Sequence, residues 1–287
     1  MRWLVRFGYD GTVFAGWARQ PGLRTVEGEL QAALSRAGLR GGEGSRGLDV
    51  ASRTDRGVSA RANALSLTSD LPAPALLRCL NGFSPEIYFS AAAAISDQFR
   101  VRAATRRIYR YFEPSPEGGP VRWRRAARHL VGEIDVRSFG RGIPPDKPCW
   151  RTVESIKIAR ADRGVVVEIR APSFVWGMVR KMVGALHEYG SGRLPLRRLQ
   201  AAALGRGGVN LPLAQPEGLV LWDVEYPLAW EYAWIGPNHR QTDWARMVHR
   251  GLWTRTQVVR TITGGESKVR RRRSASLTSR VSRTKVS

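Results

Sequence analysis

Strand-like and helix-like hydrophobic patterns follow one another along residues 1–227, and their order constrains the fold more than any other feature. Residues 2–7 and 107–112 alternate between two faces, which is typical of strands, and we expect the first strand to be edge-like or half-buried. Residues 26–37 and 174–189 place apolar side chains at helical spacing. Helices and strands joined by short loops predict an α+β fold, in which helices pack against a mixed sheet.

Local signals add further elements. Thr25 can cap the helix over residues 26–37, and Gly38 can end it. The Gly-rich stretch over residues 38–47 lacks the Gly-Lys-Ser/Thr ending of a phosphate-binding loop, so we interpret it as a flexible connection. The remaining patterns predict a strand over 63–67, helices over 71–80 and 195–204, a hairpin over 153–170 and a last strand over 219–224, while residues 87–95 continue the first domain.

The charge of the chain indicates the kind of partner. Lys and Arg number 47 against 24 Asp and Glu, which gives a formal charge of +23. Residues 264–287 hold eight basic residues and one acidic residue, so a charge of +16 remains on the rest of the chain. A basic excess of this size favours a polyanionic partner.

The length of 287 residues suggests about two domains. We expect an N-terminal α/β domain over 1–105 and a C-terminal α/β domain over 106–227, followed by a helical, Trp-rich extension over 228–263. Residues 264–287 predict a basic, disordered tail, because they bury little and repel one another. This tail either adds non-specific RNA affinity or is a passive solvated end.

Cysteine and histidine usage favours neither disulfides nor a metal site. Cys79 and Cys149 are isolated in the sequence, which suggests a reducing compartment, and the four histidines are scattered. No apolar run approaches the length of a membrane span, and the N-terminus lacks a signal-peptide pattern. We therefore expect a cytoplasmic protein with no membrane partner and no metal.

One loop concentrates the candidate chemistry. Asp55 lies between Arg53 and Arg56, and it is followed by Gly57, where a sharp turn can lift a side chain out of a sheet surface. Nearby positive charge favours the ionised form of a carboxylate, which suits a nucleophile or a base. A purely structural ion-paired turn would explain the same residues.

Three other features have both a structural and a functional interpretation. Tyr109 and Tyr111 share one face of a strand, where they pack in the core or where one ring stacks on a base. Arg180 lies on the flank of the helical stripe over 174–189, as a surface arginine or at the edge of a cleft. A basic cluster surrounds Trp123 and consists of Arg122, Arg124, Arg125 and Arg128. It is either a solvated face or a contact with phosphates.

The same loop belongs to a series of short motifs. In chain order they are Tyr9-Asp10-Gly11-Thr12 with Phe14, Gly16-Trp17 and Gln20-Pro21; Thr25-Val26; Arg53-Thr54-Asp55 with Gly57-Val58 and Ala60; Asn81 with Pro85-Glu86-Ile87; Phe99 with Arg102; Arg107-Ile108-Tyr109-Arg110-Tyr111; Gly132 with Phe139; Arg151-Thr152-Val153; Phe174 with Met178-Val179-Arg180 and Val183-Gly184; and Pro216 with Gly218-Leu219 and Tyr226-Pro227. Each motif alone is a weak signal. Together, over roughly residues 1–227, they resemble the TruA family of tRNA pseudouridine synthases.

The resemblance implies a pseudouridine-synthase fold, in which two α/β domains share an extended, mainly antiparallel mixed sheet with a central basic cleft. It also implies conversion of uridine to pseudouridine at positions 38–40 of the tRNA anticodon arm, by a homodimer that binds tRNA across both subunits. The reaction moves the glycosidic bond from N1 to C5 of uracil. No electrons are transferred and no group is added, so we expect no cofactor.

By the same resemblance, Asp55 is the catalytic carboxylate, Arg180 is its ion-pair partner, and Tyr109 supports the target base. The target uridine must leave its stack, and we expect Arg53 to fill the vacancy. Arg56 is expected to contact a phosphate or to lie in solvent. The other expected substrate contacts are Thr54, Tyr111 and Gln20.

Three positions depart from the family pattern. Ser52 stands where Gly is common, Arg56 stands where a small residue is common, and Trp176-Gly177 replaces a polar pair. These departures concern which uridines of the tRNA would be modified. The alternative function is a catalytically silent RNA-binding or RNA-chaperone protein on the same fold. A DNA-binding regulator is disfavoured, because the sequence has no helix-turn-helix or finger pattern.

Overall fold

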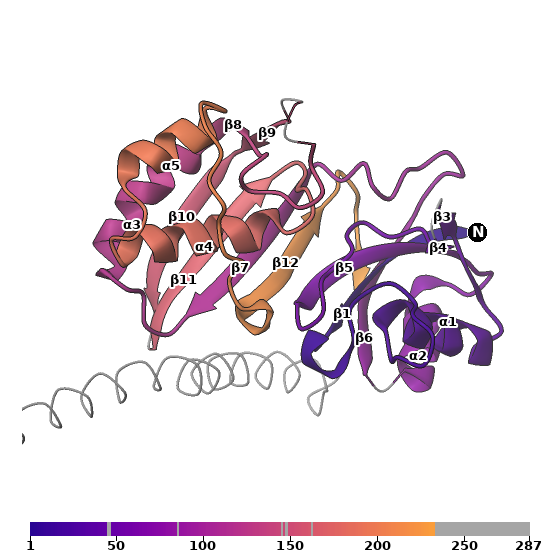
Figure 1. The fold of residues 1–287 in the computed structure, drawn as a ribbon. Coiled ribbons are helices and arrows are strands. Elements are labelled where there is room, and N and C mark those ends of the chain that lie inside the picture. Colours follow the sequence, from indigo (N-terminus) through magenta and orange to yellow (C-terminus); the bar gives the residue numbers. More distant parts are fainter. Residues whose placement is uncertain (45–46, 85, 145, 147–148, 162, 233–287) are drawn as a thin grey trace, which may run out of the picture.

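The computed structural model describes residues 1–44, 47–84, 86–144, 146, 149–161 and 163–232. In this part of the chain a nine-stranded sheet extends through both halves of the molecule (Figure 1). Its strands lie in the order β10-β11-β7-β12-β5-β1-β6-β13, and β2 pairs with β5 beside this path. The pairing is antiparallel apart from β12 with β5, which is parallel. The predicted α+β fold with a mixed, mainly antiparallel sheet is confirmed.

The bounds of the elements follow the predicted order. The strands are β1 (Arg2–Tyr9), β2 (Arg40–Gly41), β3 (Glu43–Gly44), β4 (Gly47–Leu48), β5 (Ser59–Thr68), β6 (Ile87–Ala94), β7 (Arg106–Glu113), β8 (Gly132–Asp135), β9 (Trp150–Val153), β10 (Ser155–Ala161), β11 (Gly164–Ala171), β12 (Leu219–Glu225) and β13 (Glu231–Tyr232). The α-helices are α1 (Val26–Arg36), α2 (Ala73–Phe83), α3 (Gly119–Ala127), α4 (Met178–Gly190) and α5 (Leu196–Ala203). Strands β3 and β4, and strands β8 and β9, form two separate small sheets.

The helices divide between the two halves of the sheet. Helices α1 and α2 lie beside β1, β5 and β6, whereas α3 and α4 lie beside β7, β10 and β11, and α5 packs next to β8 (Figure 1). One large buried cluster includes side chains from both halves, among them Phe7, Trp17, Trp123 and Met182. The apolar stripes seen in the sequence therefore contribute to a shared core.

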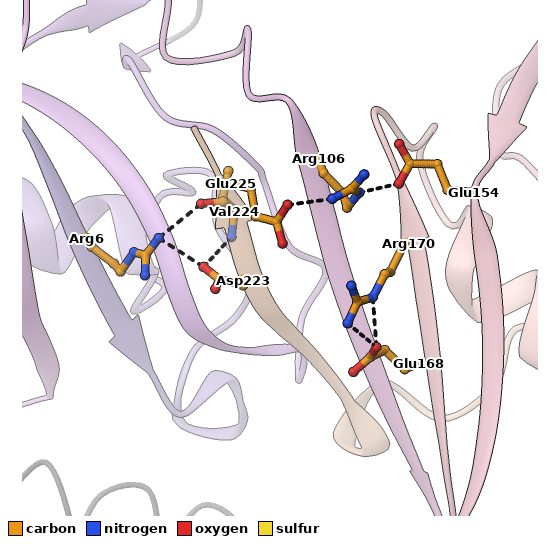
Figure 2. Close-up of polar contacts among 8 residues, drawn as sticks. All are labelled: Arg6, Arg106, Glu154, Glu168, Arg170, Asp223, Val224 and Glu225. Carbon is orange, nitrogen blue, oxygen red and sulfur yellow. Dashed lines mark hydrogen bonds and ion pairs between the residues drawn. The ribbon is translucent and has the colours of Figure 1, made fainter. Parts of the chain in front are cut away.

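Strand β12 joins the two halves. It pairs antiparallel with β7 over most of its length, and parallel with β5 at Ser59 and Ala60. Arg6 of β1 reaches across to it, with Nη2 3.1 Å from Oδ1 of Asp223 and 3.3 Å from the carbonyl oxygen of Val224 (Figure 2). On the other side, Arg106 of β7 bridges Glu225 and Glu154 (Figure 2). These contacts fasten β12 to β7 and, across the intervening β5, to β1.

Several local expectations are confirmed by the structure. Thr25 caps α1, because its hydroxyl oxygen accepts a hydrogen bond from the backbone N–H of Gly28 at 3.2 Å. Strands β10 and β11 form the expected hairpin, with Ala161 paired to Gly164. Within β7, Tyr109 and Tyr111 lie on the same face of the strand, as the sequence pattern predicted, and Phe112 packs on the other face.

Other expectations are wrong. Strand β1 is neither edge-like nor half-buried: it pairs with β5 on one side and β6 on the other, and Leu4 is as buried as Val5. The stretch over 38–47, expected to be a flexible connection, contains β2, β3 and the start of β4 where it is described.

The fourth helix also begins later than expected. It starts at Met178 rather than near Phe174, because Gly177 adopts a φ of 75° that is incompatible with a continuing helix. Residues 174–176 thus form a loop in front of the helix.

At the C-terminal end, residues 231–232 of the expected helical extension form β13, which pairs with β6. The rest of the expected extension, residues 233–263, and the expected tail over 264–287 lie outside the described residues.

Candidate active site

Hydrogen bonds from the first strand and from the segment that follows it support the loop that carries Asp55. The Thr54 side chain is buried and its hydroxyl lies 2.8 Å from that of Tyr9, while the backbone N–H of Trp17 donates to the Thr54 carbonyl oxygen at 3.1 Å. The N–H of Val58 donates to the carbonyl oxygen of Asp55 at 3.1 Å and closes the turn. Gly57 completes it with a φ of 83°. These hydrogen bonds therefore fix the backbone that carries Asp55.

Arg107 ties the same loop to the second half of the chain. From β7 its buried guanidinium donates to the carbonyl oxygens of Ala51, Arg102 and Pro172 at 3.2, 2.7 and 2.5 Å. Nε also lies 3.3 Å from the hydroxyl oxygen of Ser52. Arg107 belongs to one of the family motifs in the sequence, but no role at the site was predicted for it.

Arg180 contacts Asp55 directly. It extends from the first turn of α4, and its Nη1 lies 2.7 Å from Oδ2 of Asp55. Its Nε donates to the carbonyl oxygen of Ala214 at 2.8 Å, and the N–H of Ala214 donates back to the Arg180 carbonyl oxygen at 3.1 Å. Both side chains are largely shielded, with 20% of Asp55 and 14% of Arg180 exposed. The guanidinium is thus fixed before it meets the carboxylate.

The second carboxylate oxygen has a different partner. Nε1 of Trp176 donates a hydrogen bond to Oδ1 of Asp55 at 2.7 Å, although the Trp176 side chain is exposed. Trp176 is one of the departures from the family pattern, and its contact with Asp55 was not predicted from the sequence. A contact between residues so far apart leaves no periodic signal in one sequence.

Tyr109 lies against the same space. Its ring is 8% exposed and meets the ring of Phe174 edge to face, with centroids 5.1 Å apart. Burial raises the pKa of the Tyr109 hydroxyl to about 12, and a hydrogen bond with Ser52 opposes part of this shift. At neutral pH the hydroxyl therefore keeps its proton, and Tyr109 presents a neutral side chain to the cavity.

A cavity of about 940 Å³ opens beside these residues. Asp55, Arg180, Tyr109, Phe174 and Trp176 all line it. Further arginines in its wall are Arg53, Arg102, Arg107, Arg141 and Arg151. A carboxylic side chain in a cavity lined by arginines and aromatic rings is a suitable arrangement for binding a nucleotide.

The other expected substrate contacts fall in different places. Thr54 lines the cavity, but its hydroxyl faces Tyr9. Tyr111 is 2% exposed, and its ring lies against Gly218 rather than in the cavity wall, so a substrate contact by this ring stays a prediction. Arg56 is exposed and lies outside the cavity wall, and the Gln20 side chain bonds the carbonyl oxygen of Ala15 at 3.4 Å, also away from the cavity.

The described residues contain no cluster of three or more His, Cys, Asp or Glu side chains that could hold a metal ion. No helix among them has the length and apolar character required to cross a bilayer.

The mixed sheet and the Asp55–Arg180 pair beside its junction define a fold of the pseudouridine-synthase class. A family model described as tRNA pseudouridine synthase matches residues 126–227. A protein of Thermococcus kodakarensis, named tRNA pseudouridine synthase A, is 36% identical over 229 residues, covering 79% of this chain and 85% of the relative. A protein of the same name from Methanothrix thermoacetophila is 37% identical over 237 residues, with 80% and 86% covered. A third, from Methanosphaerula palustris, is 33% identical over 262 residues, with 90% and 91% covered. The chain belongs to the TruA family of tRNA pseudouridine synthases.

Proposed function

We propose that this chain is an isomerase that converts uridine to pseudouridine in tRNA, at positions 38–40 of the anticodon arm. One observation carries the proposal: Asp55 sits in a cavity walled by arginines, and each of its carboxylate oxygens accepts a hydrogen bond from the second half of the chain. The family membership supports the reaction and the tRNA substrate. The position in the anticodon arm is the expectation that the family resemblance supplies.

The proposed reaction starts with a uridine extruded into the cavity, at a cost of about a few kcal/mol. The bond from ribose C1′ to uracil N1 breaks, the base turns, and a bond from C1′ to C5 forms. The hydrogen on C5 passes to water as a proton, and N1 takes up a proton from water, so the product is an isomer of the substrate. Asp55 supplies the carboxylate beside C1′ and C6. Arg180 orients this carboxylate and balances its charge through the contact at 2.7 Å.

The remaining residues bind and position the RNA in this proposal. The Tyr109 ring supports the base, because a buried ring offers a flat apolar face to a nucleobase. Arg53, which lines the cavity, fills the vacancy in the RNA stack. Arg102, Arg141 and Arg151, the other arginines of the cavity wall that are not bound to Asp55 or buried on backbone carbonyls, contact phosphates. Together they form the basic cleft expected between the halves.

We further propose that residues 1–105 and 106–227 act as two domains, and that the chain works in the cytoplasm as a homodimer. These proposals rest on the family resemblance. A mass measurement in solution, with and without tRNA, tests the dimer.

A tritium-release assay tests the activity. With tRNA labelled at C5 of uridine, the wild-type chain should release tritium to water. Asp55→Asn should release none while its tRNA affinity stays within about a few-fold of wild type, because the amide keeps the shape and loses the charge. Asp97→Asn, a change of an exposed acid, is the matched control and should behave as wild type. Tight tRNA binding by an inactive wild-type chain would favour the silent RNA-binding alternative.

A further inference from the structure

Trp176 combines exposure with a specific contact. Its side chain is 57% exposed, which is unusual for the largest apolar residue, yet its indole N–H points at the carboxylate of Asp55. An exposed tryptophan without a fixed partner would sample several rotamers. The surroundings of Trp176 explain why it holds this one.

The backbone of the loop before α4 turns the indole toward Asp55. Gly177 has a φ of 75°, and a Cβ at this position would lie 3.0 Å from Cγ of Arg141. The absence of a side chain lets Arg141 lie along the loop. The N–H of Arg141 donates to the carbonyl oxygen of Trp176 at 2.8 Å, which pins the residue at its backbone.

The ring is held as well. The guanidinium carbon of Arg141 lies 4.1 Å from the centroid of the Trp176 ring. A cation over an aromatic face is favourable by about 0.5–1 kcal/mol even at an exposed site. Lys181 fixes the segment that carries Arg141, because its Nζ donates to the carbonyl oxygen of Gly140 at 2.9 Å. Trp176 is thus clamped at both its backbone and its ring.

We propose that Trp176 is a positioning residue for Asp55, which deepens the proposed function and rests on it. Arg180 holds Oδ2 and Trp176 holds Oδ1, both at 2.7 Å. Two donors from the same half of the chain fix the rotation of the carboxylate about its Cβ–Cγ bond. Each oxygen retains a further lone pair for the reacting nucleotide, since a carboxylate offers about four acceptor sites. The neutral indole orients the acid without adding a second full positive charge.

The contact is tested without catalysis, by NMR of the full-length chain labelled with ¹⁵N-tryptophan. The indole N–H signal missing from Trp176→Phe identifies Trp176. In Asp55→Ala this signal should move upfield and its hydrogen should exchange faster with water, and Asp55→Asn should produce a smaller change in the same direction. A signal unchanged by both substitutions would overturn the proposal.

The catalytic consequence is tested by steady-state kinetics with tRNA. Trp176→Phe keeps the ring over Arg141 and removes the N–H. Because a hydrogen bond to a charged group is lost, kcat should fall about 10-fold or more while KM stays within about 3-fold. Trp150→Phe changes another exposed tryptophan, outside the cavity wall, and should leave both constants unchanged.

Three outcomes would overturn the positioning role: an unchanged kcat, a kcat that rises because the ring had blocked the site, or a KM effect alone, which marks an RNA contact. A wild-type chain without tritium release would instead end the proposed function, whereas the spectra would still report whether Trp176 contacts Asp55. The two failures are therefore distinguishable.

Discussion

Asp55 and Arg180 are 125 residues apart in the chain, and a distance of 2.7 Å separates Oδ2 of the acid from Nη1 of the arginine. Asp55 precedes β5 in the first half of the sheet, while Arg180 belongs to the first turn of α4 in the second half. The parallel pairing of β12 with β5 lies a few residues from the Asp55 loop. The geometry of the acid therefore depends on how the two halves are joined.

Arg180→Ala should reduce kcat by about 100-fold or more. The pair is largely shielded from water, and removal of one partner leaves a partly buried charge uncompensated. Arg180→Lys should retain part of the activity, because one ammonium keeps the charge but cannot reproduce the guanidinium bonds to both Asp55 and Ala214. Arg197→Ala, an exposed arginine of α5, serves as control. Equal activity of Arg180→Ala and the control in the tritium assay would refute the role of Arg180.

Arg53 and Arg56 lie on either side of Asp55 in the sequence, and substitution of each serves as the comparison for the other. Arg53 lines the cavity and Arg56 is exposed outside it. Arg53→Ala should lower kcat/KM by about 10-fold or more, since a group that fills the vacated stack acts on the extruded state. Arg56→Ala should weaken tRNA binding slightly and lower the salt slope by about one unit or less. Filter binding and single-turnover kinetics on both variants measure the difference, and a larger catalytic loss in Arg56→Ala would reverse the assignment.

Tyr109 gives the stability of the chain a dependence on alkaline pH. Burial raises the pKa of its hydroxyl from 10.0 to about 12. Between these values the folded chain keeps a proton that the unfolded chain has lost, so the free energy of unfolding falls as pH rises. One proton corresponds to about 1.4 kcal/mol per pH unit. Burial also raises the pKa of Tyr9 and of Tyr226, which add to the slope in the same direction.

Tyr109→Phe should therefore flatten this decline, and denaturant unfolding between pH 9 and 11 measures it. Parallel curves for the variant and wild type would contradict the burial of the hydroxyl. Activity at neutral pH should stay within about a few-fold, because the ring remains and the hydroxyl is neutral in either case. Tyr109→Leu removes the ring and should lose activity by a larger factor.

A substitution at Gly11 tests how closely the backbone packs against the loop that carries Asp55. A Cβ there would lie 2.0 Å from the carbonyl oxygen of Val58, which is backbone and cannot move aside without displacing the turn that carries Asp55. Gly11→Ala should destabilise the chain by about 1–3 kcal/mol through overpacking and should reduce kcat. Gly82→Ala is the control, since no atom lies within 4 Å of the added group and Ala favours the α2 helix. Denaturant unfolding compares the free energies of unfolding of the two variants. A Gly11→Ala variant with wild-type stability and kcat would show that the loop adapts to the added methyl group.

Much of the fold could be predicted because its signals are local. The Thr25 cap fixed the start of α1, and the Gly-containing turn joined β10 to β11. The alternation in β7 correctly placed Tyr109 and Tyr111 on one face. Such features depend on neighbours within a few residues, which a sequence displays directly.

The rest depends on contacts between distant residues. The interior place of β1 follows from its pairing with both β5 and β6, and no local pattern encodes two partners. Val175 fits the helical stripe, yet Gly177 delays the helix and frees Trp176 for Asp55. Arg180 was placed beside Asp55 by family resemblance, whereas its position on the helix alone fits a surface arginine equally well. The structure shows the pair directly.

Site-resolved mapping of pseudouridine in tRNA tests the central claim most directly. The tRNA would come from cells that lack this chain, and from the same cells supplied with wild type or with Asp55→Asn at matched expression. The account predicts that pseudouridine disappears from positions 38–40, returns with wild type and stays absent with Asp55→Asn. Unchanged pseudouridine in the cells that lack the chain, or its return with Asp55→Asn, would contradict it.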